Sequence, residues 1–403
     1  MKFTLKDYQE DAVHDVLENL RKARRRWRED GDKHAFSLTA TTGAGKTVMA
    51  AAVFEALLYG DADFDFEADP GAAIIWFSDD PSLNEQTRFR LMEASDRLQH
   101  SDLVVVQNTF NRERLQAGKI YFLNTQKLNK NSLLVRGHDP EAESRRDPTF
   151  PDMRPDLRSH TIWDIIQNTI EDPALTLYLV LDEAHRGMGA TTAAAANEKS
   201  TIVKRLINGA GGVPGVPIVW GISATVERFN EAMASDGSRT RLPNVVVDPA
   251  KVQESGLIKD TIVLDVPDEA GQFDTVLLRR ATEKVREVSA EWLRYSQEQG
   301  IETVAPLLVV QAPNTPDPNE LGRALDTIFQ QWPDLPETSV AHVFGEHKTQ
   351  TFGKYSVPYI EPQRVQDDTS IRILIAKDAI STGWDCPRAE VMYRFARLTT
   401  RPT

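Results

Sequence analysis

Residues 35–58 join three patterns that together restrict the fold strongly. Residues 35–39 are mostly apolar, the next eight residues read Ala-Thr-Thr-Gly-Ala-Gly-Lys-Thr, and residues 46–58 have the composition of a helix. A strand, a glycine-rich turn and a helix in this order form a loop whose backbone N–H groups can surround phosphate oxygens. Glycine permits the tight turn, and the start of the helix favours an anion. The region therefore predicts an α/β domain that binds a nucleoside phosphate.

The polar side chains of this loop suggest how the phosphates and a metal ion are held. We expect Lys46 to reach the β- and γ-phosphates and the Thr47 hydroxyl to ligate Mg²⁺. Ala40 stands where the pattern G-x-x-x-x-G-K-[ST] has its first glycine, but the Gly-x-Gly-Lys-Thr part is intact. The residues expected at the phosphates are Thr42, Gly43, Ala44, Gly45, Lys46 and Thr47.

A pair of acids follows another apolar run. Residues 177–181 read Leu-Tyr-Leu-Val-Leu and are followed by Asp182 and Glu183. Acids at the carboxyl end of a parallel strand lie where open α/β sheets bind ligands. Asp182 would hold Mg²⁺ through water, and Glu183 would orient and deprotonate the attacking water. Such a pair alone often only caps a helix, but together with the upstream loop it indicates a nucleoside triphosphatase.

Short apolar runs alternate with amphipathic stretches along most of the chain, which predicts βα units with parallel sheets. The chain divides at about residue 255, giving two α/β domains at 1–255 and 256–403. Residues 136–161 are crowded with Asp, Pro and Arg and are expected to form a surface loop. The predicted strands are 35–39, 73–77, 103–106, 120–124, 177–181, 218–222, 261–266, 306–311, 339–344, 371–376 and 390–395.

Composition restricts the class of protein and its cellular compartment more than its function. The 403 residues carry a formal net charge of -13, 40% hydrophobic residues and a single cysteine, Cys386. This balance is globular, and one cysteine excludes an internal disulfide and a Cys-rich zinc cluster. We find no signal peptide and no run long enough to span a membrane, so we expect a cytoplasmic protein. A basic block at residues 21–28 is interpreted mainly as a solvated helix face, with nucleic-acid contact as the alternative.

Four further segments resemble, in order, the motifs of the DEAD/DEAH-box helicases of superfamily 2, and in particular the motor (Res) subunit of type III restriction enzymes. They are Leu-Lys-Asp-Tyr-Gln at 5–9, Asp-Glu-Ala-His at 182–185, Ser-Ala-Thr at 223–225 and Gly-Trp-Asp-Cys-Pro-Arg-Ala at 383–389. Weaker matches at 77–86 and 124–127 fall where this superfamily contacts the nucleic-acid strand. The resemblance covers nearly the whole chain. It implies two RecA-like lobes with parallel sheets, of which the second is incomplete.

The resemblance also implies roles for single residues. Gln9 would read the adenine edge, and His185 would link the ATP site to the nucleic acid. Ser223 and Thr225 would couple hydrolysis to movement of the lobes. Gly383 and Asp385 would contact the nucleotide from the second lobe. Residues 376–385, which lead into this segment, resemble the fifth motif, and there Lys377 replaces the usual threonine at a backbone contact to nucleic acid.

One expected motif is missing. The superfamily has a sixth motif with arginines that reach the γ-phosphate, and the chain reaches Thr403 without that pattern. We favour the interpretation that the sequence is a fragment, and the alternative is an arginine supplied by a partner chain. Because an arginine finger accelerates turnover by roughly 10³- to 10⁵-fold, we expect this chain to bind ATP and hydrolyse it slowly.

The leading hypothesis is an ATP- and Mg²⁺-dependent DNA helicase or translocase that serves restriction or phage defence. A partner subunit, a methyltransferase or a nuclease, is expected, and no membrane is. The alternatives are a DEAH-type RNA helicase and a catalytically weak, ATP-binding regulatory subunit of a larger complex.

Overall fold

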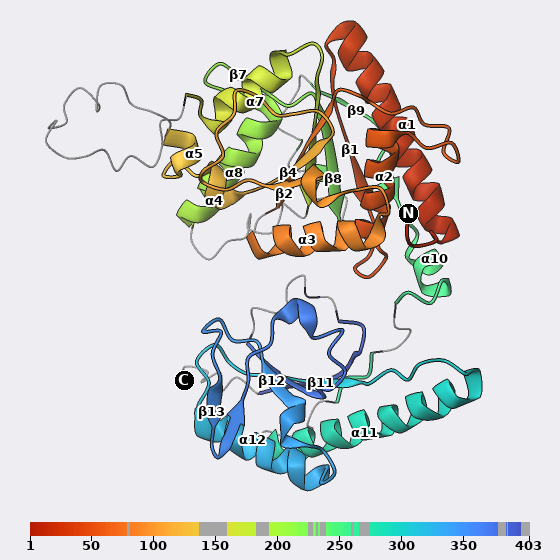
Figure 1. The fold of residues 1–403 in the computed structure, drawn as a ribbon, viewed down its shortest axis with the longest axis vertical. Helices are drawn as coiled ribbons and strands as arrows, with labels where there is room; N and C mark the ends of the chain where they lie inside the picture. Colours follow the sequence, from red (N-terminus) through yellow and green to blue (C-terminus); the bar gives the residue numbers. More distant parts are fainter. Residues whose placement is uncertain are drawn as a thin grey trace, which may run out of the picture. The chain divides into compact units, whose positions relative to one another are not determined.

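The chain forms two compact units, Met1–Thr261 and Ile262–Thr403 (Figure 1). The structure is a computed structural model that describes residues 1–78, 81–136, 159–182, 193–224, 229–230, 233, 239–258, 262–265, 274–377, 384 and 386–395. Residues 81–83, 193–200 and 274 are described in their backbone only. Of the surface loop expected at residues 136–161, residues 137–158 lie outside the described part.

The first unit is built on one sheet, with the strand order β10-β1-β8-β5-β2-β4-β3 and β9 beside β1. Every pairing in it is parallel. The central strands are mostly apolar and almost entirely buried, as parallel strands covered on both faces require. The strands are β1 (Lys33–Thr39), β2 (Ala72–Ser78), β3 (Leu103–Val105), β4 (Lys119–Asn124), β5 (Thr176–Asp182), β8 (Ile218–Ser223), β9 (Arg239–Arg241) and β10 (Val245–Val246).

Helices cover both faces of this sheet. α1 (Asp7–Asp30), α2 (Lys46–Tyr59) and α3 (Pro81–Ala94) pack on one face, where alternate strand residues such as Trp76 and Trp220 meet them. α7 (Ile162–Glu171) and α8 (Ala193–Asn208) pack on the other face, against the intervening residues such as Phe77. Shorter elements are α4 (Thr125–Leu128), α5 (Leu133–Arg136), α10 (Pro249–Glu254), a 3-10 turn at His100–Asp102 and a hairpin of β6 (Gly209–Ala210) and β7 (Val213–Pro214).

The sequence of α1 explains why this helix packs where it does. Val13, Val16, Leu17 and Leu20 recur at helical spacing and are buried. The helix ends at Gly31, whose φ of 74° is left-handed and whose N–H donates to the Trp27 carbonyl. The buried face fixes α1 against α2, so the start of α1 lies beside the loop that precedes α2.

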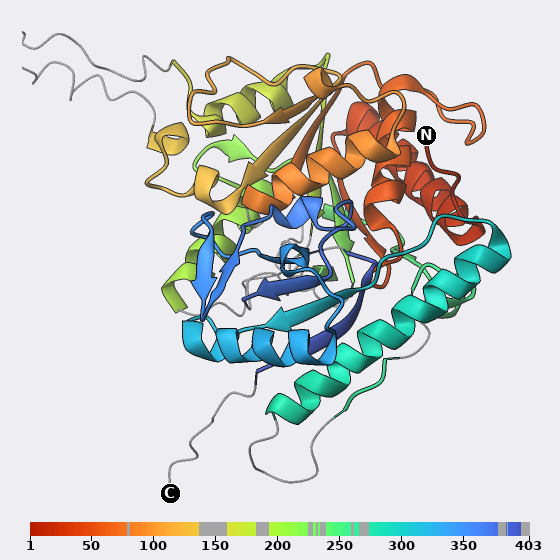
Figure 2. The same cartoon turned by 60° about the horizontal axis from the view of Figure 1, so that its bottom comes forward.

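The second unit has a parallel sheet in the order β12-β15-β11-β16. Figure 2 shows its two long helices, α11 (teal) and α12 (blue), on one side of this sheet, where both contribute to one apolar cluster. An antiparallel hairpin, β13 with β14, packs beside α12. The elements are α11 (Asp274–Gln299), β11 (Leu307–Gln311), α12 (Pro318–Gln331), β12 (Val340–His342), β13 (Gln350–Phe352), β14 (Tyr355–Val357), β15 (Ile373–Ala376) and β16 (Ala389–Arg394), with 3-10 turns at Glu337–Ser339 and Pro362–Arg364.

The strand predicted at residues 261–266 is wrong for the residues that the structure describes. Residues 262–265 form no strand, and Ile262, Val263 and Leu264 are each more than 80% exposed. An apolar run indicates a buried strand only if a neighbouring strand and a packed face are available, and no strand among the described residues pairs with residues 262–265.

Candidate nucleotide-binding site

The glycine-rich loop connects β1 to α2, as the sequence predicts. Gly43 and Gly45 have φ values of 87° and 77°, a left-handed conformation that glycine adopts without strain. A Cβ atom on Gly45 would also lie 2.4 Å from Nε2 of Gln9. Both positions therefore require glycine, which explains why the Gly-x-Gly part of the pattern is intact.

Lys46 is the first residue of α2, and its ammonium group folds back over the loop. Nζ donates to the carbonyl oxygens of Ala40 at 2.9 Å and Thr41 at 3.1 Å. The Thr41 hydroxyl is buried and has no hydrogen-bond partner among the described residues. The loop thus encloses a cation and an unsatisfied hydroxyl, a combination suited to anionic oxygen atoms.

Gln9 contacts this loop directly. It is 4% exposed, and its Nε2 donates to the Ala44 carbonyl at 3.0 Å while its Oε1 accepts from the Lys6 N–H at 3.0 Å. The Tyr8 hydroxyl donates to the same Ala44 oxygen at 2.9 Å, a contact that sequence reasoning missed. An amide has two donor hydrogens and two acceptor lone pairs, so its oxygen can accept one more hydrogen bond besides that from Lys6. The adenine-reading role of Gln9 stays a prediction.

Two of the predicted site residues, Asp182 and Ser223, lie at one edge of the sheet. Thr39, Asp182 and Ser223 end the neighbouring parallel strands β1, β5 and β8. The register pairs Thr39 with Ser223 and Asp182 with Ile222. In addition, the Ala40 N–H donates to the Ser223 carbonyl at 3.2 Å. The edge therefore gathers the start of the glycine-rich loop, Asp182 and Ser223, although these residues are far apart in the sequence.

Several predicted site residues lie outside the described residues. They are Glu183, His185, Thr225, Gly383 and Asp385. Two described residues in this part of the second unit are Trp384 and Cys386. The Trp384 Nε1 donates to the Pro362 carbonyl at 3.0 Å, and Trp384 and Cys386 pack against the same apolar cluster. Arg388 is 2% exposed, and its guanidinium donates to four carbonyl oxygens, which include those of Val365 and Ile371. This segment is held by packing and by Arg388, which sequence reasoning did not single out.

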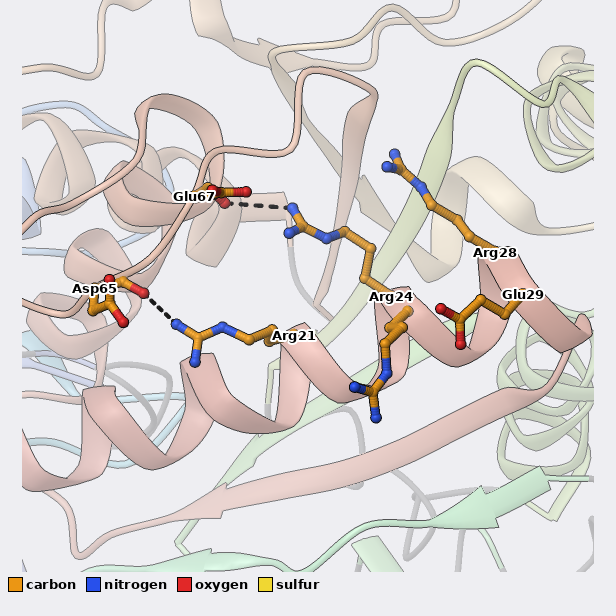
Figure 3. Close-up of a pocket in the computed structure, with 7 residues that line it drawn as sticks. Arg21, Arg24, Arg28, Glu29, Asp65 and Glu67 are labelled. Carbon is orange, nitrogen blue, oxygen red and sulfur yellow. Dashed lines mark hydrogen bonds between the residues drawn. The ribbon is translucent and has the colours of Figure 1, made fainter.

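The basic block on α1 divides into two half-buried arginines that hold a loop and other cations that are exposed, as a solvated helix face predicts. Arg21 and Arg24 donate to the main-chain carbonyls of Asp65 and Glu67, the second at 3.4 Å (Figure 3). Their guanidinium groups lie 5.4 and 5.7 Å from the centre of the buried Phe66 ring. The cavity of about 500 Å³ between them is also lined by carboxylates, so its charge is mixed. These arginines attach the loop between α2 and β2 to α1.

The end of the same helix reaches a buried carboxylate. Arg28 donates to Asp69 at 2.7 Å, and the side chain of Asp69 is fully buried. The Tyr178 hydroxyl donates to the other Asp69 oxygen at 2.8 Å. Burial and the Asp69 charge hold the pKa of Tyr178 well above its usual range. In contrast, Arg25 lines the cavity with no hydrogen bond or ion pair to any described residue.

The residues of the glycine-rich loop fit a nucleoside triphosphate. Lys46 and the unpartnered Thr41 hydroxyl would face phosphate oxygens, and Thr47 with Asp182 would hold Mg²⁺. When bound, Mg²⁺ would neutralise charge on the phosphates. No group of three or more metal-ligating side chains occurs in the part of the chain that the structure describes. A hydroxyl, one carboxylate and water would be sufficient for Mg²⁺, which keeps several water ligands.

A sequence model of the family described as "Type III restriction enzyme, res subunit" (ResIII) matches residues 2–228. This span includes Gln9, the glycine-rich loop, Asp182 and Ser223, and it is more than half of the chain. The chain belongs to the ResIII family. The resemblance to superfamily 2 helicases of the Res type is thereby confirmed. A comparison with curated protein sequences gives no match for this ResIII chain.

One solved helicase structure, with a TM-score of 0.50, supports the fold of this ResIII protein, and two others align with lower TM-scores. The DEAD-box helicase Mss116, solved with ssRNA and UDP-BeF, aligns with a TM-score of 0.50 at 13% identity, over 97% of this chain and 64% of the other. The DUF1998 helicase MrfA, solved with DNA, aligns with a TM-score of 0.46 at 12% identity, over 97% of this chain and 47% of the MrfA chain. Dbp5 of S. cerevisiae, solved with RNA and ADP BeF3, aligns with a TM-score of 0.43 at 13% identity, over 96% of this chain and 78% of the Dbp5 chain. The predicted α/β fold with two RecA-like lobes and parallel sheets is confirmed.

The ResIII chain spans 47% of the MrfA chain and 64% of the Mss116 chain. In the part of the chain that the structure describes, no helix is both long and apolar enough to cross a membrane.

Proposed function

We propose that this protein is an ATP-dependent motor on nucleic acid, acting as a DNA helicase or translocase in restriction or phage defence. The observation that carries the proposal is the position of Lys46. Its ammonium group is bound within the glycine-rich loop, at the sheet edge where β5 ends in Asp182 and β8 ends in Ser223. A cation in the loop after β1 and a carboxylate at the end of β5, at the same edge of one sheet, are what phosphoryl transfer with Mg²⁺ requires.

Each remaining site residue has a role in this proposal. The loop residues 42–47 hold the phosphates, with Lys46 on the β- and γ-phosphates and Thr47 on Mg²⁺. Asp182 holds the metal through water, and Glu183 accepts a proton from the attacking water. The residues proposed to relay hydrolysis to the nucleic acid and the second unit are His185, Ser223, Thr225, Gly383 and Asp385, and Gln9 reads adenine.

The preference for DNA is proposed from the family. The description of the ResIII family names a restriction enzyme, and restriction acts on DNA. The same family membership supports a partner subunit, a methyltransferase or a nuclease, in a larger complex. RNA is the competing substrate, because the Mss116 structure, which aligns with a TM-score of 0.50, was solved with ssRNA.

The decisive experiment measures ATP hydrolysis with single-stranded DNA, duplex DNA and single-stranded RNA of equal length. We expect DNA to stimulate turnover and Lys46→Ala to abolish the stimulated rate. Stimulation by RNA alone would replace the DNA proposal with the RNA one. If Glu183→Gln left both turnover and the activity of the assembled complex unchanged, the regulatory interpretation would replace the motor.

A further inference from the structure

The loop that follows β12 in the second unit is organised by a buried histidine. His342 is fully buried, and its Nδ1 accepts from the Phe344 N–H at 3.1 Å. Its Nε2 lies 2.9 Å from the Lys348 carbonyl, to which it donates. One ring therefore fixes both ends of residues 344–348. Burial lowers the pKa of His342, which favours the neutral ring that these two bonds need.

This loop presents an exposed ring at its tip. His347 is exposed, and its ring stacks on Tyr359 with centroids 4.6 Å apart and planes at 22°. Its φ of 50° is left-handed, which among the described non-glycine residues occurs otherwise only at Asp65. Tyr359 is fixed in turn because its neighbours exchange backbone bonds with His342, from His342 N–H to the Pro358 carbonyl and from Ile360 N–H to the His342 carbonyl. The stacked pair is thus held by backbone on both sides.

Two lysines belong to the same loop region as the ring pair. The strand β15 lies beside β12 in parallel, so the residue after β15, Lys377, emerges at the same edge of the sheet as the loop. Its ammonium lies 3.5 Å from a Glu346 carboxylate oxygen and 4.3 Å from the centre of the Phe344 ring. Lys348, next to His347, is exposed. Ring faces beside ammonium groups suit a chain of bases joined by phosphates.

We propose that His347 and Tyr359 form a platform on which an unpaired base of a single nucleic-acid strand stacks. The inference rests on the proposed function, since it assigns a base contact to the strand that the motor would hold. The exposed His347 ring, backed by the half-buried Tyr359 ring in a nearly parallel plane, gives a base a flat surface, and every base has a face that can stack. The unusual backbone of His347 has an explanation in this role, because it turns the ring onto Tyr359 instead of away from it.

The experiment measures binding of two labelled oligonucleotides of equal length by fluorescence anisotropy, with a non-hydrolysable ATP analogue present. One is oligo-dT, and the other is the same phosphodiester backbone without bases. We expect the unaltered protein to bind oligo-dT about tenfold more tightly than the abasic strand. His347→Gly keeps the left-handed backbone but removes the ring, so the preference should fall to about twofold or less while abasic binding stays unchanged.

Two variants separate this role from others. Tyr359→Phe keeps a ring and should keep the preference for bases, whereas Lys348→Ala should weaken both strands equally through the loss of a phosphate contact. Equal loss of both strands in His347→Gly, or no preference for bases in the unaltered protein, would overturn the platform. Failure of the unaltered protein to bind either strand would overturn the proposed function itself, and the platform with it.

Discussion

The Gln9 amide donates to the Ala44 carbonyl at 3.0 Å, so the start of α1 is bonded to the glycine-rich loop. The Tyr8 hydroxyl reaches the same oxygen at 2.9 Å, and burial raises the pKa of Tyr8, which keeps the hydroxyl protonated as a donor. A carbonyl has two lone pairs, and these two donors use both. Residues 8 and 9 therefore constrain the shape of a loop more than thirty positions away.

Replacing Gln9 with alanine should weaken ATP binding by roughly fivefold, which corresponds to about 1 kcal/mol for one lost hydrogen bond. The loop would keep the Tyr8 contact and would still form. Titration with ATP and with GTP distinguishes two roles of Gln9. Loss confined to ATP would identify an adenine reader, and equal loss for both nucleotides would identify a residue that shapes the loop. Unchanged binding of both would contradict either role.

Lys46→Ala should reduce ATP turnover by on the order of 10²- to 10³-fold, as expected when one preorganised charge is removed from a transition state. Because Lys46 also bonds to the Ala40 and Thr41 carbonyls, nucleotide affinity should fall as well. The matched control is Lys251→Ala, since Lys251 is exposed and its ion pair among the described residues is with the exposed Asp11. A normal rate in Lys46→Ala would show that hydrolysis occurs elsewhere.

The edge of the first sheet could be predicted because its strands are buried parallel strands. Runs such as residues 177–181 are apolar throughout, so their ends, and the polar residues that follow, are visible in the sequence. The strands β9 and β10 could not be found in this way, because β9 is a polar Arg-Thr-Arg and β10 has only two residues. Residues 262–264 show the opposite error: their apolar composition predicts a strand, but they are exposed and pair with no strand among the described residues.

Contacts that depend on tertiary packing were not visible in the sequence. Arg239 belongs to a polar stretch, yet it is buried and donates to the carbonyls of His34, Ile207, Val216 and Pro217. The Tyr8 contact with Ala44 and the stacking of His347 on Tyr359 are of the same kind. A motif supplies the type of residue, but the partners come from segments that only the fold brings together.

Acid should weaken the fold through His342. Its pKa is lowered chiefly by burial, with Lys377 adding to this and the Lys348 carbonyl and Glu346 opposing it. At a pH between the two pKa values, the unfolded chain binds a proton at His342 and the folded chain does not. The contribution of the neutral ring to the free energy of unfolding is therefore complete above about pH 6.5 and is lost as pH falls toward the lowered pKa. The His342 ring signals in an NMR titration should move at a lower pH than those of an unfolded peptide. Titration at or above pH 6.5 would contradict the burial argument.

The arginines of α1 should differ sharply in their effect on stability. Arg28→Ala leaves the buried Asp69 carboxylate without its cation, and we expect a loss of about 2–3 kcal/mol, less than for a wholly buried pair because Arg28 is 44% exposed. Arg25→Ala removes a side chain that bonds to no described residue, and the expected change is within about 0.5 kcal/mol. Urea denaturation of both variants tests this difference. Because both residues lie on one helix, equal losses of stability in the two variants would show that the change in helix propensity of α1 causes the loss, and not the Asp69 network. A loss for Arg28→Ala that disappears in the Asp69→Asn background would assign it to the buried carboxylate.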